Sequence, residues 1–114
     1  MSDNNYWSEL DALVKNKGFT IERAKDTAHP KYPDYIYPLD YGFIPNTVSS
    51  DGAEIDAWRG TLTNQSVTGI AATYDGIKSD MEVKGLIGCS GNDKKKIQAV
   101  HNQGSMSAVI IDRK

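Results

Sequence analysis

Residues 37–47 of this chain read Tyr37-Pro38-Leu39-Asp40-Tyr41-Gly42-Phe43-Ile44-Pro45-Asn46-Thr47, and Asp51-Gly52-Ala53-Glu54-Ile55-Asp56 follows after three residues. No lysine or arginine occurs between Lys31 and Arg59, although the interval carries several carboxylates: Asp34, Asp40, Asp51, Glu54 and Asp56. If the fold gathers these carboxylates, they repel one another unless protons, solvent or a hard divalent cation intervene. The stretch therefore predicts a site for a divalent cation.

Length and composition indicate one soluble domain that spans residues 1–114. The formal net charge is -2 and 25% of the residues are charged, which gives the chain no polyelectrolyte character. Nucleic acid is not expected as a partner, because contacts to its phosphates require clustered cations. The one dense positive run, Lys94-Lys95-Lys96, is interpreted as the solvated face of a helix.

The single cysteine, Cys89, excludes a disulfide within the chain and fits a reducing compartment. We expect it to be a small core residue. The first residues lack the basic and then apolar regions of a signal peptide, and no apolar run approaches the roughly twenty residues of a membrane span. A cytoplasmic protein with no membrane partner is therefore expected.

The N-terminal half is predicted to contain one helix and one strand before a long loop. Asn4 or Asn5 can cap a helix that Gly18 ends. Phe19 to Arg23 alternates in polarity as a strand does. All four prolines lie between residues 30 and 45, so this region is expected to be an ordered loop and not a core strand.

The C-terminal half is predicted to be mostly strand. Ile55–Thr61, Val67–Tyr74 and Met81–Ile87 read as an antiparallel meander with turns at Asn64-Gln65 and Asp75-Gly76. Asn92 or Asp93 can cap a second helix that Gly104 ends, and Ser107–Ile111 reads as a last strand. The predicted fold is mainly β with α: a small closed or curved antiparallel barrel with a helix near each end of the chain.

The residues alone also indicate which groups could bind a metal and a phosphate. Mg²⁺ accepts a few carboxylates, keeps several waters and adds phosphate oxygens, which makes Asp51 and Asp56 natural candidates. Asp75 and Asp80 lie at a strand-to-strand turn, and Glu82 and Lys84 fall on one face of the strand after it. That pair suits a metal with a phosphate, or else is an exposed polar face of the sheet.

The stretch from Glu22 to Lys84 resembles the soluble family I inorganic pyrophosphatases. Their hallmark is Tyr-Pro-x-Asn-Tyr-Gly-Tyr/Phe-Ile followed by Asp-Gly-Asp-Pro-x-Asp, which Tyr37–Ile44 and Asp51–Asp56 match with the spacing kept. The resemblance implies a five-stranded barrel of the oligonucleotide-binding type and Mg²⁺ as cofactor, with Mn²⁺ as an alternative. It also implies hydrolysis of a phosphoanhydride by a metal-activated water.

The resemblance assigns roles to individual residues. It implies Asp51, Asp56 and Glu82 as the main metal ligands, with Asp75 and Glu22 serving further metal ions. Lys31, Lys84 and Tyr41 would hold phosphate, and Tyr37 is either a ligand contact or a packed aromatic. Asp51, Asp56, Tyr41 and Lys31 form the catalytic set.

Two departures from the family pattern bear on activity. Ala53 stands where the family has a carboxylate that orients or deprotonates the attacking water. Glu54 is adjacent but points to the opposite face of an extended segment. The family hairpin with a phosphate-binding arginine is reduced to Pro33–Ile36, which leaves Arg23 and Arg59 as stand-ins that we expect at the surface or the rim.

Two functions follow from these residues, and a third is disfavoured. The first is hydrolysis of pyrophosphate, or of another small phosphorylated compound, by an enzyme. The second is a catalytically weak module that binds a divalent metal and a small phosphorylated ligand. Single-strand nucleic-acid binding is disfavoured by the acidic cluster. The family is commonly oligomeric, which makes a homo-oligomer an open expectation for this short chain.

Overall fold

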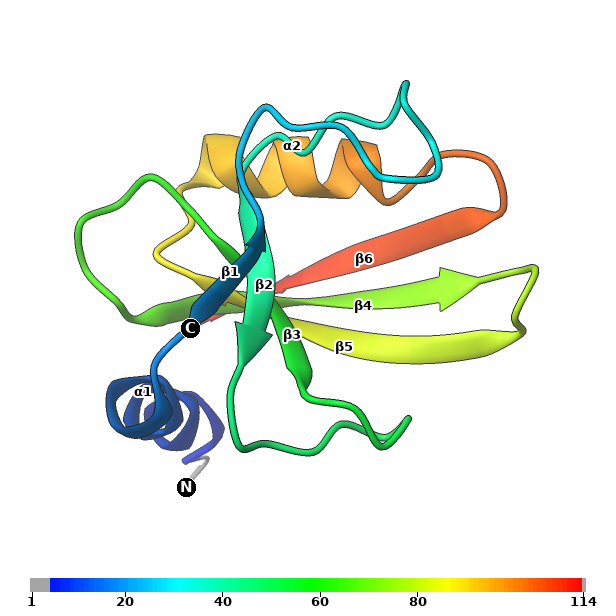
Figure 1. Ribbon diagram of the computed structural model, residues 1–114. Helices are drawn as coiled ribbons and strands as arrows, with labels where there is room; N and C mark the ends of the chain where they lie inside the picture. The colour runs from blue at the N-terminus through cyan, green and yellow to red at the C-terminus, as the bar shows by residue number, and fades with distance from the viewer. Residues whose placement is uncertain (1–4, 114) are drawn as a thin grey trace.

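The computed structural model describes residues 5–113, which form one six-stranded mixed sheet with two helices. The strand order across the sheet is β1-β2-β3-β5-β4-β6. Figure 1 shows a strongly twisted sheet, in which β1 and β2 run across the direction of β4 to β6. In chain order the elements are α1 (Tyr6–Lys17), β1 (Thr20–Arg23), β2 (Asp40–Ile44), β3 (Ile55–Arg59), β4 (Val67–Asp75), β5 (Asp80–Ile87), α2 (Gly91–Val100) and β6 (Met106–Asp112).

The predicted fold class, mainly β with a helix near each end of the chain, is confirmed, and the curved sheet is open. Strands β4 and β5 form the expected antiparallel hairpin around Asp75 and Asp80. The antiparallel meander is wrong at β3, because β3 pairs with β5 and runs parallel to it. Within residues 5–113 the sheet is open and has six strands, where the resemblance implied five in a barrel.

The expectation of an ordered loop without core strand is wrong for residues 40–44. Asp40–Ile44 forms β2, which pairs antiparallel with β1 on one side and β3 on the other. Pro38 and Pro45 flank the strand and lie outside it, so neither removes a hydrogen bond from its ladder. A Cβ atom at Gly42 would collide with the backbone carbonyl of Thr20, so this position requires the glycine of the Tyr-Gly motif.

Both faces of the sheet carry apolar clusters, each covered by a different helix. On one face Trp58 and Leu86 pack with Ile97 of α2 and with Leu39 from the preceding loop. On the other face Ala57, Ile44 and Ile87 pack with Val14 of α1. Because neighbouring residues of a strand point to opposite faces, Trp58 belongs to the first cluster and Ala57 to the second. Cys89 is buried in the first cluster, as predicted.

The helix ends agree with the sequence only in part. Gly18 ends α1 with a positive φ of 81°, as expected, and Asn5 occupies the N-cap position without a side-chain hydrogen bond. Asn4 lies outside the described residues. Helix α2 begins earlier than predicted, since Ser90 is its N-cap and Asp93 completes a capping box from the third helical position. None of the helices in residues 5–113 is long and apolar enough to cross a membrane.

His101 is the C-cap of α2, and its side chain is buried in the core. Its Nε2 atom accepts a hydrogen bond from the indole Nε1–H of Trp58 over 3.0 Å. Burial, and to a smaller degree the charge of Lys84, lower the pKa of His101 from 6.5 to about 4. The neutral imidazole therefore belongs to the folded core.

We expect His101 to make the protein sensitive to acid. The unfolded chain binds a proton near pH 6.5 and the folded chain near pH 4, so stability falls as the pH drops through this interval, by on the order of 3 kcal/mol. His101→Gln keeps a hydrogen-bond acceptor but cannot titrate, so its free energy of unfolding should change less between pH 6.5 and 4. Urea unfolding across this range measures both slopes, and equal slopes would contradict this role.

Candidate functional site

Tyr41, Asp56 and Lys84 meet on the sheet face that α2 covers. The Tyr41 hydroxyl donates a hydrogen bond to Asp56 Oδ2 over 2.8 Å, and Lys84 Nζ donates to the Tyr41 hydroxyl oxygen over 2.8 Å. Lys84 Nζ also lies 3.3 Å from Asp56 Oδ2 and 3.6 Å from Glu82 Oε1. Four predicted site residues are thus brought together, although up to 43 positions separate them in the sequence.

The sheet register explains this meeting. Tyr41 of β2 lies opposite Trp58 of β3, and Asp56 lies two residues before Trp58 on the same face. In the parallel pair, Ala57 lies opposite Gly85, which places Lys84 and Leu86 on the face of Trp58. Glu82 and Lys84 share that face, as the sequence predicts. The adjacency of Lys84 and Asp56 depends on the parallel pairing, which the meander would not give.

The site is shielded from water on its inner side and open on its outer side. Lys84 is 7% exposed at its side chain, whereas Asp56 is 32% and Glu82 is 23% exposed. Burial raises the pKa of Tyr41 far above its ordinary value, and the neighbouring Asp56 carboxylate adds to this effect. The Tyr41 hydroxyl therefore keeps its proton, which it donates to Asp56, and presents its oxygen to the Lys84 ammonium.

Tyr37, predicted as either a ligand contact or a packed aromatic, is buried and adjoins the site. Its ring lies 5.8 Å from that of Tyr41 and 6.0 Å from that of Trp58, measured between centroids. Burial raises the pKa of the Tyr37 hydroxyl, while the positive charge of Arg23 acts in the opposite direction. Glu22 and Asp56 also act electrostatically on this hydroxyl. Tyr37 thus links β1 with the Tyr41 cluster.

The other predicted residues lie in turns or on exposed segments. Asp51 Oδ1 accepts from the backbone N–H of Ala53 over 3.0 Å, and Asp75 Oδ1 accepts from that of Ile77 over 2.9 Å. Glu22 is exposed on β1. Lys31 is exposed on the loop before β2, and its backbone N–H donates to His29 Nδ1. Within the described residues, none of these side chains has a hydrogen bond to Tyr41, Asp56 or Lys84.

Two carboxylates of the site could hold a divalent metal. In residues 5–113 no group of three His, Cys, Asp or Glu side chains is arranged to hold a metal ion. Mg²⁺, however, is usually held by one or two carboxylates together with waters and substrate phosphates. Asp56 and Glu82 are two partly exposed carboxylates beside the same ammonium, Lys84 Nζ. This pair fits a magnesium ion that is bound together with a phosphate.

Residues that line the site from β3 and α2 were missed at the sequence level. Trp58 is fully buried, and its ring centroid lies 4.7 Å from that of Tyr41. His101 fixes the indole from the other side. The alternation of Asp56 and Trp58 in one strand could have revealed Trp58 as a neighbour, whereas His101 carries no local signal.

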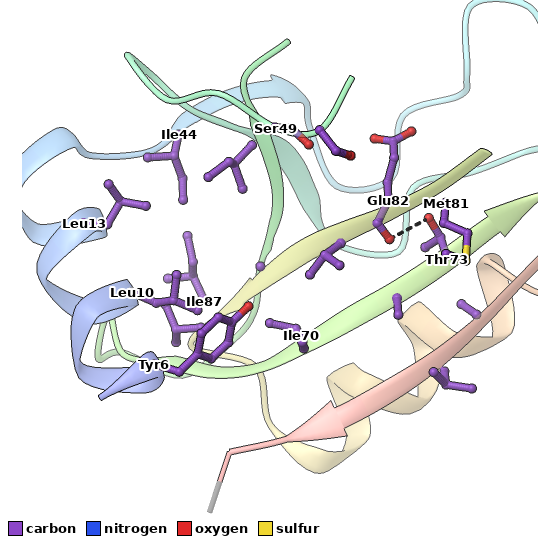
Figure 2. A pocket seen from close by; sticks show the side chains of 18 of the residues that line it. Tyr6, Leu10, Leu13, Ile44, Ser49, Ile70, Thr73, Met81, Glu82 and Ile87 are labelled. Carbon is purple, nitrogen blue, oxygen red and sulfur yellow. Dashed lines mark hydrogen bonds between the residues drawn. The ribbon is translucent and has the colours of Figure 1, made fainter. Parts of the chain in front are cut away.

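A pocket of about 680 Å³ lies on the opposite face of the sheet. Figure 2 shows Leu10 and Leu13 of α1 and Ile70 of β4 around it. Ile44 and Ile87, which also line it, belong to the apolar cluster on the α1 face. No lysine or arginine is among its described lining residues, and Glu82 is the residue that it shares with the site around Tyr41.

Comparison with known proteins gives the same picture. The family model described as inorganic pyrophosphatase matches residues 15–106. The inorganic pyrophosphatase of Picrophilus torridus is 62% identical over 26 residues, which are 23% of this chain and 15% of that protein, so the matched segment spans a small part of its length.

Solved pyrophosphatase structures share the fold. The Neisseria gonorrhoeae structure has a TM-score of 0.64 at 18% identity and covers 85% of this chain and 84% of its own. The Thermus thermophilus structure has a TM-score of 0.55 at 22% identity and covers 83% of this chain and 81% of its own. Because the family model matches more than half of the residues, the chain belongs to the inorganic pyrophosphatase family.

Proposed function

We propose that this protein hydrolyses inorganic pyrophosphate to phosphate. The observation that carries the proposal is the contact of Lys84 with the Tyr41 hydroxyl and the Asp56 carboxylate at a partly open site. In the reaction, water attacks one phosphorus, the bridging P–O bond breaks, and two phosphates form. Membership of the inorganic pyrophosphatase family supports this activity.

Asp56 and Glu82 would hold a magnesium ion, with Mn²⁺ as an alternative. When bound, such an ion lowers the pKa of a water and offsets charge on the phosphate. The family is generally dependent on divalent metals, which supports this cofactor. Asp51 stays a prediction as a main metal ligand, and Asp75 and Glu22 stay predictions as ligands of further ions. Their side chains lie in turns or on an exposed strand.

The chain's own groups bind and orient the phosphates. The Lys84 ammonium, held by Tyr41 and two carboxylates, needs no reorganisation to donate to a phosphate oxygen that reaches the site. The Tyr41 hydroxyl bonds both Lys84 and Asp56 and so holds the two side chains in fixed positions relative to each other. Lys31 is the exposed cation of the preceding loop and is proposed to bind the outer phosphate.

A second candidate, a catalytically weak module that binds metal and phosphate, is favoured by Ala53. Its methyl group cannot accept a proton, and its backbone N–H is already bonded to Asp51 Oδ1. Such a module would bind Mg²⁺ and pyrophosphate in a calorimeter without releasing phosphate. A cytoplasmic location, a homo-oligomer and other small phosphorylated substrates stay predictions under either function.

Metal dependence tests the proposed function. Phosphate release from pyrophosphate should proceed with Mg²⁺ or Mn²⁺, stop when EDTA is added in excess, and return when excess Mg²⁺ is restored. Circular dichroism before and after EDTA checks that the chain stays folded. Release that is unaffected by EDTA would contradict the metal-assisted reaction.

A further inference from the structure

Arg23 is the arginine that the fold brings to the Tyr41 cluster. It ends β1 and lies opposite Tyr41 in the register of β1 with β2. A shift in that register between Ile21 and Arg23 changes the alternation of the strand just before this position. Such bulges re-aim a side chain and are common beside active sites. The positive charge of Arg23 lies close enough to the Tyr37 hydroxyl to lower the pKa of that group, against the larger effect of burial.

The chain's other two arginines are engaged elsewhere. Arg59 Nη1 donates to the backbone carbonyl of Ile87 over 3.2 Å. Arg113 Nη1 donates to Asp11 Oδ2 over 2.8 Å and forms an ion pair with it. Arg23 has no ion pair among residues 5–113, and its Nη1 atom donates to the carbonyl of Glu22 over 3.3 Å. A guanidinium has five N–H donors, so this contact leaves several for a ligand.

The charge balance of the site calls for a second cation. Lys84 is flanked by Asp56 and Glu82, so the cluster is not positive before a ligand arrives. Pyrophosphate adds several negative charges on two phosphorus centres. A planar guanidinium can bind two oxygens of one phosphate at once, which a lysine ammonium does not do. Arg23 lies opposite Tyr41 on the neighbouring strand and near Tyr37, whereas Lys84 contacts the Tyr41 hydroxyl. The two cations therefore approach Tyr41 from different strands.

We propose that Arg23, which lies opposite Tyr41 in the sheet, binds the phosphate of pyrophosphate that Lys84 does not hold, and that the nearby Tyr37 hydroxyl positions its guanidinium for this task. Arg23 is half-buried, which fits the rim position expected from the sequence, and the proposal adds a phosphate contact to that position. The inference rests on the proposed function for its substrate. It concerns binding, so it can be tested without turnover.

The test measures binding of imidodiphosphate, a non-hydrolysable analogue of pyrophosphate, by calorimetry in the presence of Mg²⁺. Arg23→Gln should weaken binding about 10- to 100-fold, since a charged hydrogen bond is lost. Arg23→Lys should recover part of the loss. Lys25→Gln, which removes an exposed positive charge two residues away, controls for the general field and should change binding less than threefold or so.

A variant of Tyr37 separates direct contact from positioning alone. If Arg23 touches the phosphate, Tyr37→Phe should weaken binding less than Arg23→Gln. Equal binding by Arg23→Gln and the native chain, or a loss no greater than that of Tyr37→Phe, would overturn the proposal. Arg23-dependent binding by a native chain that releases no phosphate would sustain this inference and remove the proposed hydrolysis. A native chain that binds no analogue would remove both.

Discussion

Replacement of Lys84 by glutamine is expected to lower kcat/KM for pyrophosphate by about two to three orders of magnitude. The ammonium is 7% exposed and already fixed by Tyr41, Asp56 and Glu82. A preorganised cation of this kind stabilises developing charge on a phosphate without reorganisation, and loss of one such donor typically costs 10² to 10³ in rate. Glutamine retains a hydrogen-bond donor for the Tyr41 oxygen, so the change removes the charge more than the contact.

The matched control for this variant is Lys94→Gln. Lys94 also pairs with a carboxylate, since its Nζ atom lies 2.9 Å from Asp112 Oδ1. This pair joins α2 to the end of β6 and does not include Tyr41, Asp56 or Glu82. Steady-state kinetics should leave Lys94→Gln within about threefold of the native chain. Thermal unfolding of both variants checks the fold, because the removal of a buried partner can cost stability. If Lys84→Gln is folded and as active as Lys94→Gln, Lys84 does not bind the reacting phosphate.

Asp56→Asn is expected to reduce turnover by at least about two orders of magnitude. Asparagine can still accept the hydrogen bond of Tyr41 through its side-chain oxygen, so the variant keeps this contact but loses the negative charge. It lacks the negative charge that a magnesium ligand supplies, and neutral oxygens hold Mg²⁺ less strongly. The loss should therefore come with weaker binding of Mg²⁺, which calorimetry measures independently of activity.

Asp112→Asn is the corresponding control, since Asp112 is 70% exposed at its side chain and pairs with Lys94 away from the Tyr41 cluster. It should retain native activity and native Mg²⁺ binding. A folded Asp56→Asn variant with the activity and metal affinity of Asp112→Asn would show that Asp56 is no metal ligand.

The site could be predicted from the sequence to the extent that it depends on local order. The Tyr-Pro to Asp56 segment identifies Tyr41 and Asp56, and strand alternation places Glu82 with Lys84, as the structure has them. The contact between Lys84 and Asp56 depends on the parallel pairing of β3 with β5. No local pattern encodes that pairing, because β4 intervenes in the chain.

Long-range packing also explains what the sequence did not indicate. Proline content argued against a strand at residues 40–44, yet the sheet accepts β2 because Pro38 and Pro45 lie just outside it. Nothing in the residues around His101 indicates that it is buried, because its burial depends on the packing of α2 against Trp58. Arg23 gains its place from a register shift between β1 and β2, which depends on the partner strand and not on the residues of β1 alone.

We propose that the Tyr41, Asp56 and Lys84 cluster turns over pyrophosphate even though Ala53 stands at a position for which the family resemblance implies a carboxylate. The most direct measurement follows phosphate release from pyrophosphate with Mg²⁺, using the native chain and Asp56→Asn at equal, folded concentrations. We predict release by the native chain at least about a hundredfold above that of the variant. Background-level release by both proteins, while the native chain still binds Mg²⁺, would contradict the proposed hydrolysis.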